Sequence, residues 1–112
     1  MDIIDTIKEQ IASHDILLYM KGSPKLPQCG FSSQAVKVLI DCGAKFAYVD
    51  ILANPDVRAS LPKYADWPTF PQLWIKSELI GGSDIMLDMY NSGDLQKIIS
   101  EVVGKPENED AQ

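Results

Sequence analysis

The sequence predicts an α/β fold in which helices cover both faces of a mixed four-stranded sheet. Two observations carry this prediction. Apolar residues alternate between helical spacing and short strand-length runs, in the order helix, strand, helix, strand, helix, strand, strand, helix, helix. The early strand–helix–strand unit favours parallel strands, whereas only two residues separate the last two strands, which is typical of an antiparallel hairpin. Helices on both faces bury the apolar side chains of such a sheet.

The chain opens with a helix and a strand. Four isoleucines recur at helical spacing and predict an amphipathic helix over residues 2–13: Ile3, Ile4, Ile7 and Ile11. The apolar run 16–20 has the length of a strand. Residues 21–28 contain one glycine and two prolines, so we expect a loop that delivers the chain to Cys29.

A second helix is expected to begin near Phe31. Four apolar residues define its inward face: Ala35, Val36, Leu39 and Ile40. Gly43 is expected to end this helix in a left-handed cap. Residues 46–50 then predict a strand, and Asn54-Pro55-Asp56 has the pattern of an N-cap followed by proline at the first helical position.

The C-terminal half predicts a hairpin and two helices. Residues 72–75 and 78–80 read as strands joined by a tight turn at Lys76-Ser77. A helix starts at Gly81-Gly82-Ser83-Asp84 and ends at Gly93. Its inward face is expected to hold Ile85, Met86, Met89 and Tyr90. A last helix is marked by Leu95, Ile98, Ile99, Val102 and Val103.

Composition and charge restrict the function. The formal net charge of −6 argues against general nucleic-acid binding, which needs clustered Lys and Arg. No apolar run approaches the ~20 residues that a membrane span needs. The three acids in residues 1–14 do not resemble a secretory signal, and two cysteines make no disulfide framework. We therefore expect a cytoplasmic protein, or a mature organellar one.

The length of 112 residues predicts a single domain. We expect this domain to span residues 1–104. Seven of the sixteen acidic residues lie in residues 84–112, and the segment 105–112 is polar with no apolar face. This segment is expected to be an acidic, partly disordered tail.

Cys29-Gly30-Phe31-Ser32 has the form of a redox turn without its second cysteine. The Ser32 hydroxyl cannot form a disulfide, so the Cys29 thiolate must find a small thiol, another protein or a metal. Ser32 alternatively caps the helix that follows. The helix N-terminus and Lys21 favour the thiolate. Gly30 allows close approach of a ligand, and Phe31 shields one side.

Two other residues of types that can bind metals are not assigned to the site. Cys42 has no basic or glycine-rich surroundings, so we interpret it as a small packing residue. His14, the single histidine, falls at the expected end of the first helix and is interpreted as solvated.

Further segments complete a candidate slot for a ligand. Thr69-Phe70-Pro71 precedes a strand, where a proline leaves backbone free to pair with an extended ligand. Gly82-Ser83-Asp84 at a helix start offers backbone donors to a carboxylate, and Asp84 can hold an ammonium group. Lys21 and Arg58 are candidates for a second carboxylate. Reduced glutathione carries two carboxylates, an ammonium group, peptide backbone and a thiol, and therefore fits this slot.

The order and spacing of these motifs resemble the single-domain monothiol glutaredoxins of the CGFS type, over about residues 1–104. The motifs are Lys21-Gly22, a six-residue loop, Cys29-Gly30-Phe31-Ser32, Trp67-Pro68-Thr69-Phe70-Pro71-Gln72-Leu73 and Gly81-Gly82-Ser83-Asp84. The resemblance implies a thioredoxin fold, a cis Pro71 and glutathione contacts at Lys21, Arg58, Thr69, Phe70, Gly82, Ser83 and Asp84. Several members carry a cysteine where this chain has Ser83, so a disulfide role at that position does not carry over.

The resemblance also implies that Cys29 ligates a 2Fe-2S cluster. In that family two chains and two glutathiones bridge one cluster, and BolA-like proteins can replace one chain. Ligand counting agrees, because such a cluster commonly takes four thiolates and a homodimer supplies two from Cys29. Two glutathiones complete the set. Half of that coordination is exchangeable, which suits a carrier that hands its cluster to apo iron–sulfur proteins.

An enzymatic function competes with the carrier hypothesis. A thiol–disulfide oxidoreductase can remove glutathione from proteins through a Cys29 mixed disulfide, and monothiol attack needs no second cysteine. The proline-stiffened loop 23–28 favours the carrier, since it can misplace a second attacking glutathione while leaving room for a cluster.

Overall fold

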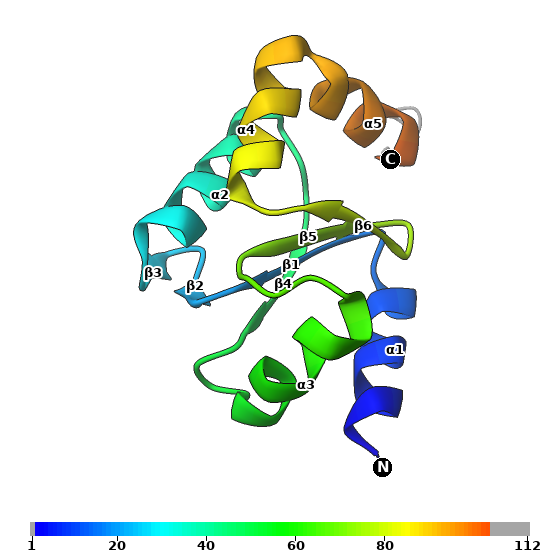
Figure 1. Ribbon diagram of the computed structural model, residues 1–112. Coiled ribbons are helices and arrows are strands. Elements are labelled where there is room, and N and C mark those ends of the chain that lie inside the picture. The colour runs from blue at the N-terminus through cyan, green and yellow to red at the C-terminus, as the bar shows by residue number, and fades with distance from the viewer. Residues whose placement is uncertain (1, 104–112) are drawn as a thin grey trace.

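A four-stranded mixed sheet forms the centre of the computed structural model, which describes residues 2–103 (Figure 1). β1 (Ile16–Met20) lies between β4 (Ala47–Asp50), with which it runs parallel, and β5 (Gln72–Ile75), with which it runs antiparallel. β6 (Glu78–Gly81) pairs antiparallel with β5 at the sheet edge. The predicted fold class, including the thioredoxin fold that the family resemblance implied, is confirmed.

Helices cover both faces of this sheet (Figure 1). α2 (Gly30–Asp41), α4 (Ser83–Ser92) and α5 (Asp94–Val103) lie on one face. α1 (Ile3–Ser13) and α3 (Pro55–Ala65) lie on the other.

The central strand β1 contributes to two cores. Ile16, Leu18 and Met20 pack beneath α2, α4 and α5. Leu17 and Tyr19 pack beneath α1 and α3. Alternate side chains of a strand point to opposite faces, so a strand covered on both sides is apolar throughout. This explains the uninterrupted apolar run, and it fixes where β1 ends and the loop to Cys29 begins.

The predicted loop at residues 21–28 contains a small hairpin. β2 (Gly22–Ser23) pairs with β3 (Leu26–Pro27). Strands of two residues are too short to show the alternation that marks a strand in a sequence. After this hairpin α2 begins at Gly30, one residue before the expected start, and Cys29 is its N-cap.

Two expected core residues are exposed. Ile40 is 60% exposed, and Val38 takes its place in the core. On a helix Val38 lies about 60° around the axis from Ala35, whereas Ile40 lies about 140° away. Ile85 is 37% exposed and lines a pocket, which leaves Met86 as the buried residue of that turn.

The predicted helix ends are largely right. Gly43 has a φ of 72° and Gly93 a φ of 88°, the left-handed values that favour glycine at these positions. Asn54 is the N-cap of α3, but its side chain makes no capping hydrogen bond and donates instead to the carbonyl of Asp50.

Within residues 2–103, no helix has the length and apolar character needed to cross a bilayer. The expected domain limit at residue 104 and the expected tail at 105–112 lie outside the described residues.

Candidate functional site

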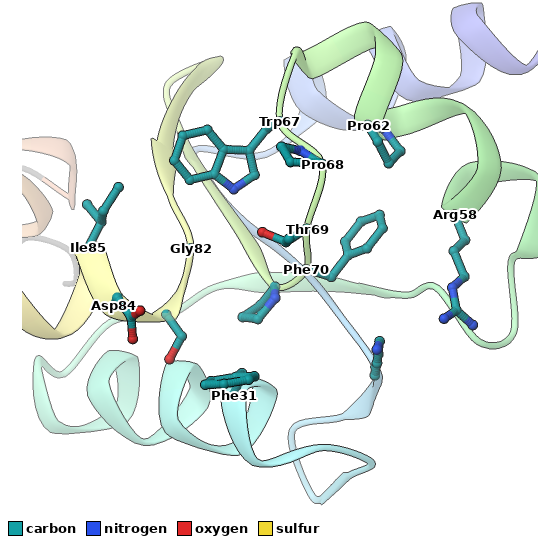
Figure 2. Close-up of a pocket in the computed structure, with 13 residues that line it drawn as sticks. Phe31, Arg58, Pro62, Trp67, Pro68, Thr69, Phe70, Gly82, Asp84 and Ile85 are labelled. Atoms are coloured by element: carbon teal, nitrogen blue, oxygen red, sulfur yellow. The ribbon is translucent and has the colours of Figure 1, made fainter.

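A pocket of about 710 Å³ opens where the ends of several elements meet (Figure 2). Its walls come from the end of β1, the first turn of α2, α3, residues 67–71 and the start of α4. Nine residues predicted from sequence line it: Lys21, Phe31, Arg58, Thr69, Phe70, Pro71, Gly82, Ser83 and Asp84. Two further predicted residues, Cys29 and Gly30, are not among the lining residues and lie next to the pocket, immediately before Phe31 in the chain. The fold therefore brings the predicted segments together.

Four lining residues escape the sequence prediction: Pro62, Trp67, Pro68 and Ile85. Trp67 and Pro68 adjoin Thr69 in one motif, and that adjacency is a signal that places them at the site. Pro62 lies inside α3, and Ile85 lies in the first turn of α4. Their exposure to the pocket depends on how each helix is rotated, which the sequence does not encode locally.

The pocket has opposite charges at its two sides. Figure 2 shows Arg58 and Asp84 on opposite sides, with Thr69 and Phe70 between them and Phe31 at the start of α2. An extended ligand that carries a carboxylate at one end and an ammonium group at the other complements this arrangement.

Cys29 holds its sulfur at the start of α2. As N-cap it accepts a hydrogen bond from the backbone N–H of Ser32, with N and Sγ 3.3 Å apart. Partial burial alone raises the pKa of this thiol. Hydrogen bonds from the Ser32 hydroxyl and from the backbone of Ser32 and Phe31, together with the charge of Lys21, outweigh burial and lower the pKa below its usual value. The predicted preference for a thiolate therefore has a local cause.

Ser32 links this sulfur to the end of β1. Its side chain is fully buried. The backbone N–H of Lys21 donates to Ser32 Oγ over 3.0 Å, and Oγ lies 3.4 Å from Cys29 Sγ. Because the oxygen already accepts from Lys21, its own hydrogen is free to donate to the ionised sulfur. The alternative expectation that Ser32 caps α2 is wrong, since Cys29 occupies the N-cap.

The backbone around Lys21 is fixed by short-range contacts. The Lys21 carbonyl accepts from the N–H of Gln28 over 2.8 Å, which closes the β2–β3 hairpin. Gly22 has a φ of +91°, and a Cβ added there would lie 2.5 Å from the carbonyl oxygen of Leu26. Only glycine fits this corner.

Residues 67–71 are held by the buried amide of Gln72. Its Nε2 donates to the carbonyls of Trp67, over 3.0 Å, and Thr69, over 3.3 Å. The Phe70–Pro71 peptide bond is cis, as the family resemblance implied. Gln72 stands in the quoted motif, but a buried glutamine that supports the loop before it has no signature of its own.

The start of α4 approaches this segment closely. A Cβ added at Gly82 would lie 3.3 Å from the carbonyl oxygen of Pro71. Ser83 is buried and its Oγ accepts from Gln34 Nε2 over 2.6 Å. The first N–H groups of a helix have no partner within it, so the backbone of this turn is suited to receive an anion.

The remaining candidates have no place in the pocket. Cys42 packs against the core, and its pKa is raised by burial and then by Asp41, consistent with a structural thiol. His14 is exposed at the end of α1. In residues 2–103, no three side chains of His, Cys, Asp or Glu gather as a metal site.

Comparison with known proteins agrees with this geometry. Residues 16–80 match the model of the Glutaredoxin family. The chain is 63% identical to Glutaredoxin 4 of Escherichia coli strain K12 over 107 residues, which cover 96% of this chain and 93% of that one. It is 59% identical to Glutaredoxin 4 of Haemophilus influenzae strain 86-028NP over 105 residues, covering 94% and 98% of the two chains.

Solved structures show the same fold. The solution structure of reduced poplar apo GrxS14 aligns with a TM-score of 0.77 and 42% identity, covering 90% of this chain and 93% of that chain. A monomeric truncated mutant of Trypanosoma brucei 1-C-Grx1 aligns with a TM-score of 0.79 and 39% identity, covering 87% and 88%. The chain belongs to the glutaredoxin family, and with serine in place of the second motif cysteine it is a monothiol member of the CGFS type.

Proposed function

We propose that this protein binds reduced glutathione in the pocket and, as a homodimer, carries a 2Fe-2S cluster as cargo between iron–sulfur proteins. Support for glutathione comes from the two charged sides of the pocket. In this proposal Lys21 and Arg58 receive one carboxylate, the first turn of α4 at Gly82 and Ser83 receives the other, and Asp84 binds the ammonium group.

The remaining pocket residues position the peptide and the thiol. The backbone at Thr69, Phe70 and Pro71 pairs with the peptide of glutathione, which brings its sulfur toward Cys29. Gly30 leaves room for that sulfur, since a Cβ added at Gly30 would meet no atom within 4 Å. Phe31, which is 63% exposed, covers one side.

The presence of one cysteine, Cys29, beside the pocket is the observation that carries the proposal. A 2Fe-2S cluster commonly takes four thiolates, and the described part of one chain assembles no metal site of its own. Two Cys29 thiolates and two glutathione thiols make a complete set of the right chemistry. Because two of these four ligands are small molecules, such a cluster can be released to an acceptor protein.

The proposed setting is the cytoplasm, with apo iron–sulfur proteins as acceptors and a BolA-like protein as an alternative second chain. These partners follow from the family alone. The residues that would present the cluster to them are Cys29 and its immediate surroundings.

A second candidate function is reductive removal of glutathione from proteins, and the lowered pKa of Cys29 favours it. The Cys29 thiolate attacks the glutathione sulfur of a protein mixed disulfide, the protein thiolate leaves, and glutathione stays bonded to Cys29. The thiolate of a second glutathione then attacks that bond, which frees Cys29 and forms glutathione disulfide.

Titration calorimetry with reduced glutathione tests the pocket assignment. We expect Lys21→Ala and Arg58→Ala each to weaken binding by about 1–3 kcal/mol, because each removes a charge-assisted contact to a carboxylate. Lys8→Ala, on the exposed side of α1, is the matched control and should bind as the original protein does. Unchanged affinity in both pocket variants would place the glutathione site elsewhere.

A further inference from the structure

Asp50 is a residue outside the pocket whose side chain ties two pocket segments together. It is the last residue of β4 and lies opposite Met20, the last residue of β1. Asp50 therefore lies beside the point where β1 ends and Lys21 follows. The same residue begins the turn that leads to α3, which carries Arg58.

One carboxylate oxygen of Asp50 receives two backbone hydrogen bonds. The N–H of Gly22 donates to Oδ1 over 2.9 Å, and the N–H of Leu52 donates to the same atom over 2.9 Å. Gly22 is buried, so its N–H needs an acceptor inside the protein. The first bond holds the segment next to Lys21, and the second holds the turn before α3.

The backbone of Asp50 reinforces the second connection. Its carbonyl accepts from Asn54 Nδ2 over 2.9 Å and from the N–H of Ala53 over 3.2 Å. The carbonyl of Asn54 in turn accepts from the N–H of Arg58 over 3.1 Å. A continuous chain of short contacts therefore leads from Asp50 to the first turn of α3.

Lys21 and Arg58 are the two basic residues that line the pocket, and they come from different segments of the chain. Their spacing decides whether both can engage one carboxylate. We propose that Asp50 is a positioning residue that fixes the spacing of Lys21 and Arg58 and thereby sets the affinity for glutathione. This inference rests on the proposed binding of glutathione.

The geometry points to hydrogen bonding as the means, not to charge. A negative charge near an anion site opposes anion binding, so Asp50 must help by placing Oδ1 between the N–H groups of Gly22 and Leu52. Asn keeps an oxygen acceptor at this distance from the backbone and removes the charge. Glu keeps the charge and moves the acceptor outward by one methylene.

Titration calorimetry with reduced glutathione separates these effects. We expect Asp50→Asn to bind glutathione within about twofold of the original protein. Asp50→Glu should bind roughly fivefold more weakly or worse, because its oxygen no longer lies where the two N–H groups can reach it. Asp56→Glu is the control: among the described residues, the Asp56 carboxylate accepts a hydrogen bond only from the neighbouring N–H of Val57, so the change should leave affinity unchanged. Loss of affinity in Asp50→Asn, or its retention in Asp50→Glu, would overturn the proposal.

A double-mutant cycle tests whether Asp50 acts through the spacing of the two cations. The spacing of the two cations matters only while both are present. In a Lys21→Ala background, Asp50→Glu should therefore weaken glutathione binding by less than about twofold further. A substitution that merely destabilises the protein would reduce glutathione affinity equally in both backgrounds, and that result would contradict the proposal. If the original protein and Lys21→Ala behave as expected but this cycle is additive, Asp50 has no positioning role and glutathione binding stands. Absence of binding to the original protein overturns both.

Discussion

The chemistry of single residues centres on the Cys29 thiol and on what lowers its pKa. Ser32 is the main contributor, because its backbone N–H and its hydroxyl both approach the sulfur. The hydroxyl is oriented by the N–H of Lys21, so the strand that ends at the pocket also positions the thiolate. The serine at the position of a resolving cysteine therefore supplies a polar group that stabilises the thiolate.

Replacement of the two cysteines separates the ligand from the packing residue. We expect Cys29→Ser to abolish cluster absorbance, because an alcohol is a poor iron ligand beside thiolates. Cys42→Ser should retain it, since Cys42 packs against the core away from the pocket. Visible spectra of both variants after anaerobic reconstitution check this. A colourless Cys42→Ser variant beside a coloured Cys29→Ser variant would reverse the assignment.

Removal of the Ser32 hydroxyl should raise the pKa of Cys29. The thiolate loses one hydrogen-bond donor in Ser32→Ala, so its ionised fraction at neutral pH falls. The rate of alkylation by iodoacetamide should then rise through a higher pH midpoint than in the original protein. The variant should also lose about 1–3 kcal/mol of stability, because the partly buried N–H of Lys21 loses its acceptor. An unchanged pH midpoint would mean that Ser32 does not act on the sulfur.

The elements of this fold position the site by where they end. β1 ends at Met20, just before Lys21, α2 begins beside Cys29, and α4 begins at Ser83, so three chain segments present backbone or side-chain groups to one pocket. The close approach of α4 to residues 67–71 depends on Gly82, which has no side chain to hold the two apart.

Addition of a methyl group at Gly82 should separate these two segments. Its Cβ would lie 3.3 Å from the Pro71 carbonyl oxygen, a tight contact with a backbone atom, and 3.7 Å from Trp67 Nε1, an ordinary contact. We expect Gly82→Ala to cost roughly 1–3 kcal/mol of stability and to weaken glutathione binding. Gly30→Ala is the control for stability, since its Cβ would meet no atom within 4 Å. Equal melting temperatures for the two variants would refute the close approach.

The order and type of the main elements follow from hydrophobic periodicity, because each strand or helix has a buried face that the sequence must supply. The same periodicity wrongly places Ile40 and Ile85 on inward helix faces, since both are apolar yet face solvent or the pocket. Eight of the nine predicted lining residues could be found from sequence because they stand in motifs with local chemical meaning, and Arg58 is suggested by its charge and by the family resemblance. Pro62 and Asp50 could not, because their roles arise from contacts between segments that only the fold brings together. Gln72 could not, because its hydrogen bonds to the loop before it leave no signature in the sequence.

At the scale of the whole molecule, one chain and the glutathione in its pocket supply half of the thiol ligands that the proposed 2Fe-2S cluster needs. It carries one reactive thiol and one pocket, and the described residues gather no metal site of three or more ligands. In the proposed function, cluster binding requires a second chain and two glutathiones, so we expect the protein to be colourless and monomeric without them. This dependence on external thiols distinguishes a carrier from a permanent redox centre.

The visible spectrum and molecular mass of the anaerobically reconstituted protein, with and without glutathione, test this dependence directly. We expect a brown dimer that holds one cluster per two chains when glutathione is present, and a colourless monomer when it is removed. A cluster that persists at full occupancy in a glutathione-free monomer would contradict the carrier function, and so would a protein that stays colourless with glutathione present and turns over glutathione mixed disulfides rapidly there.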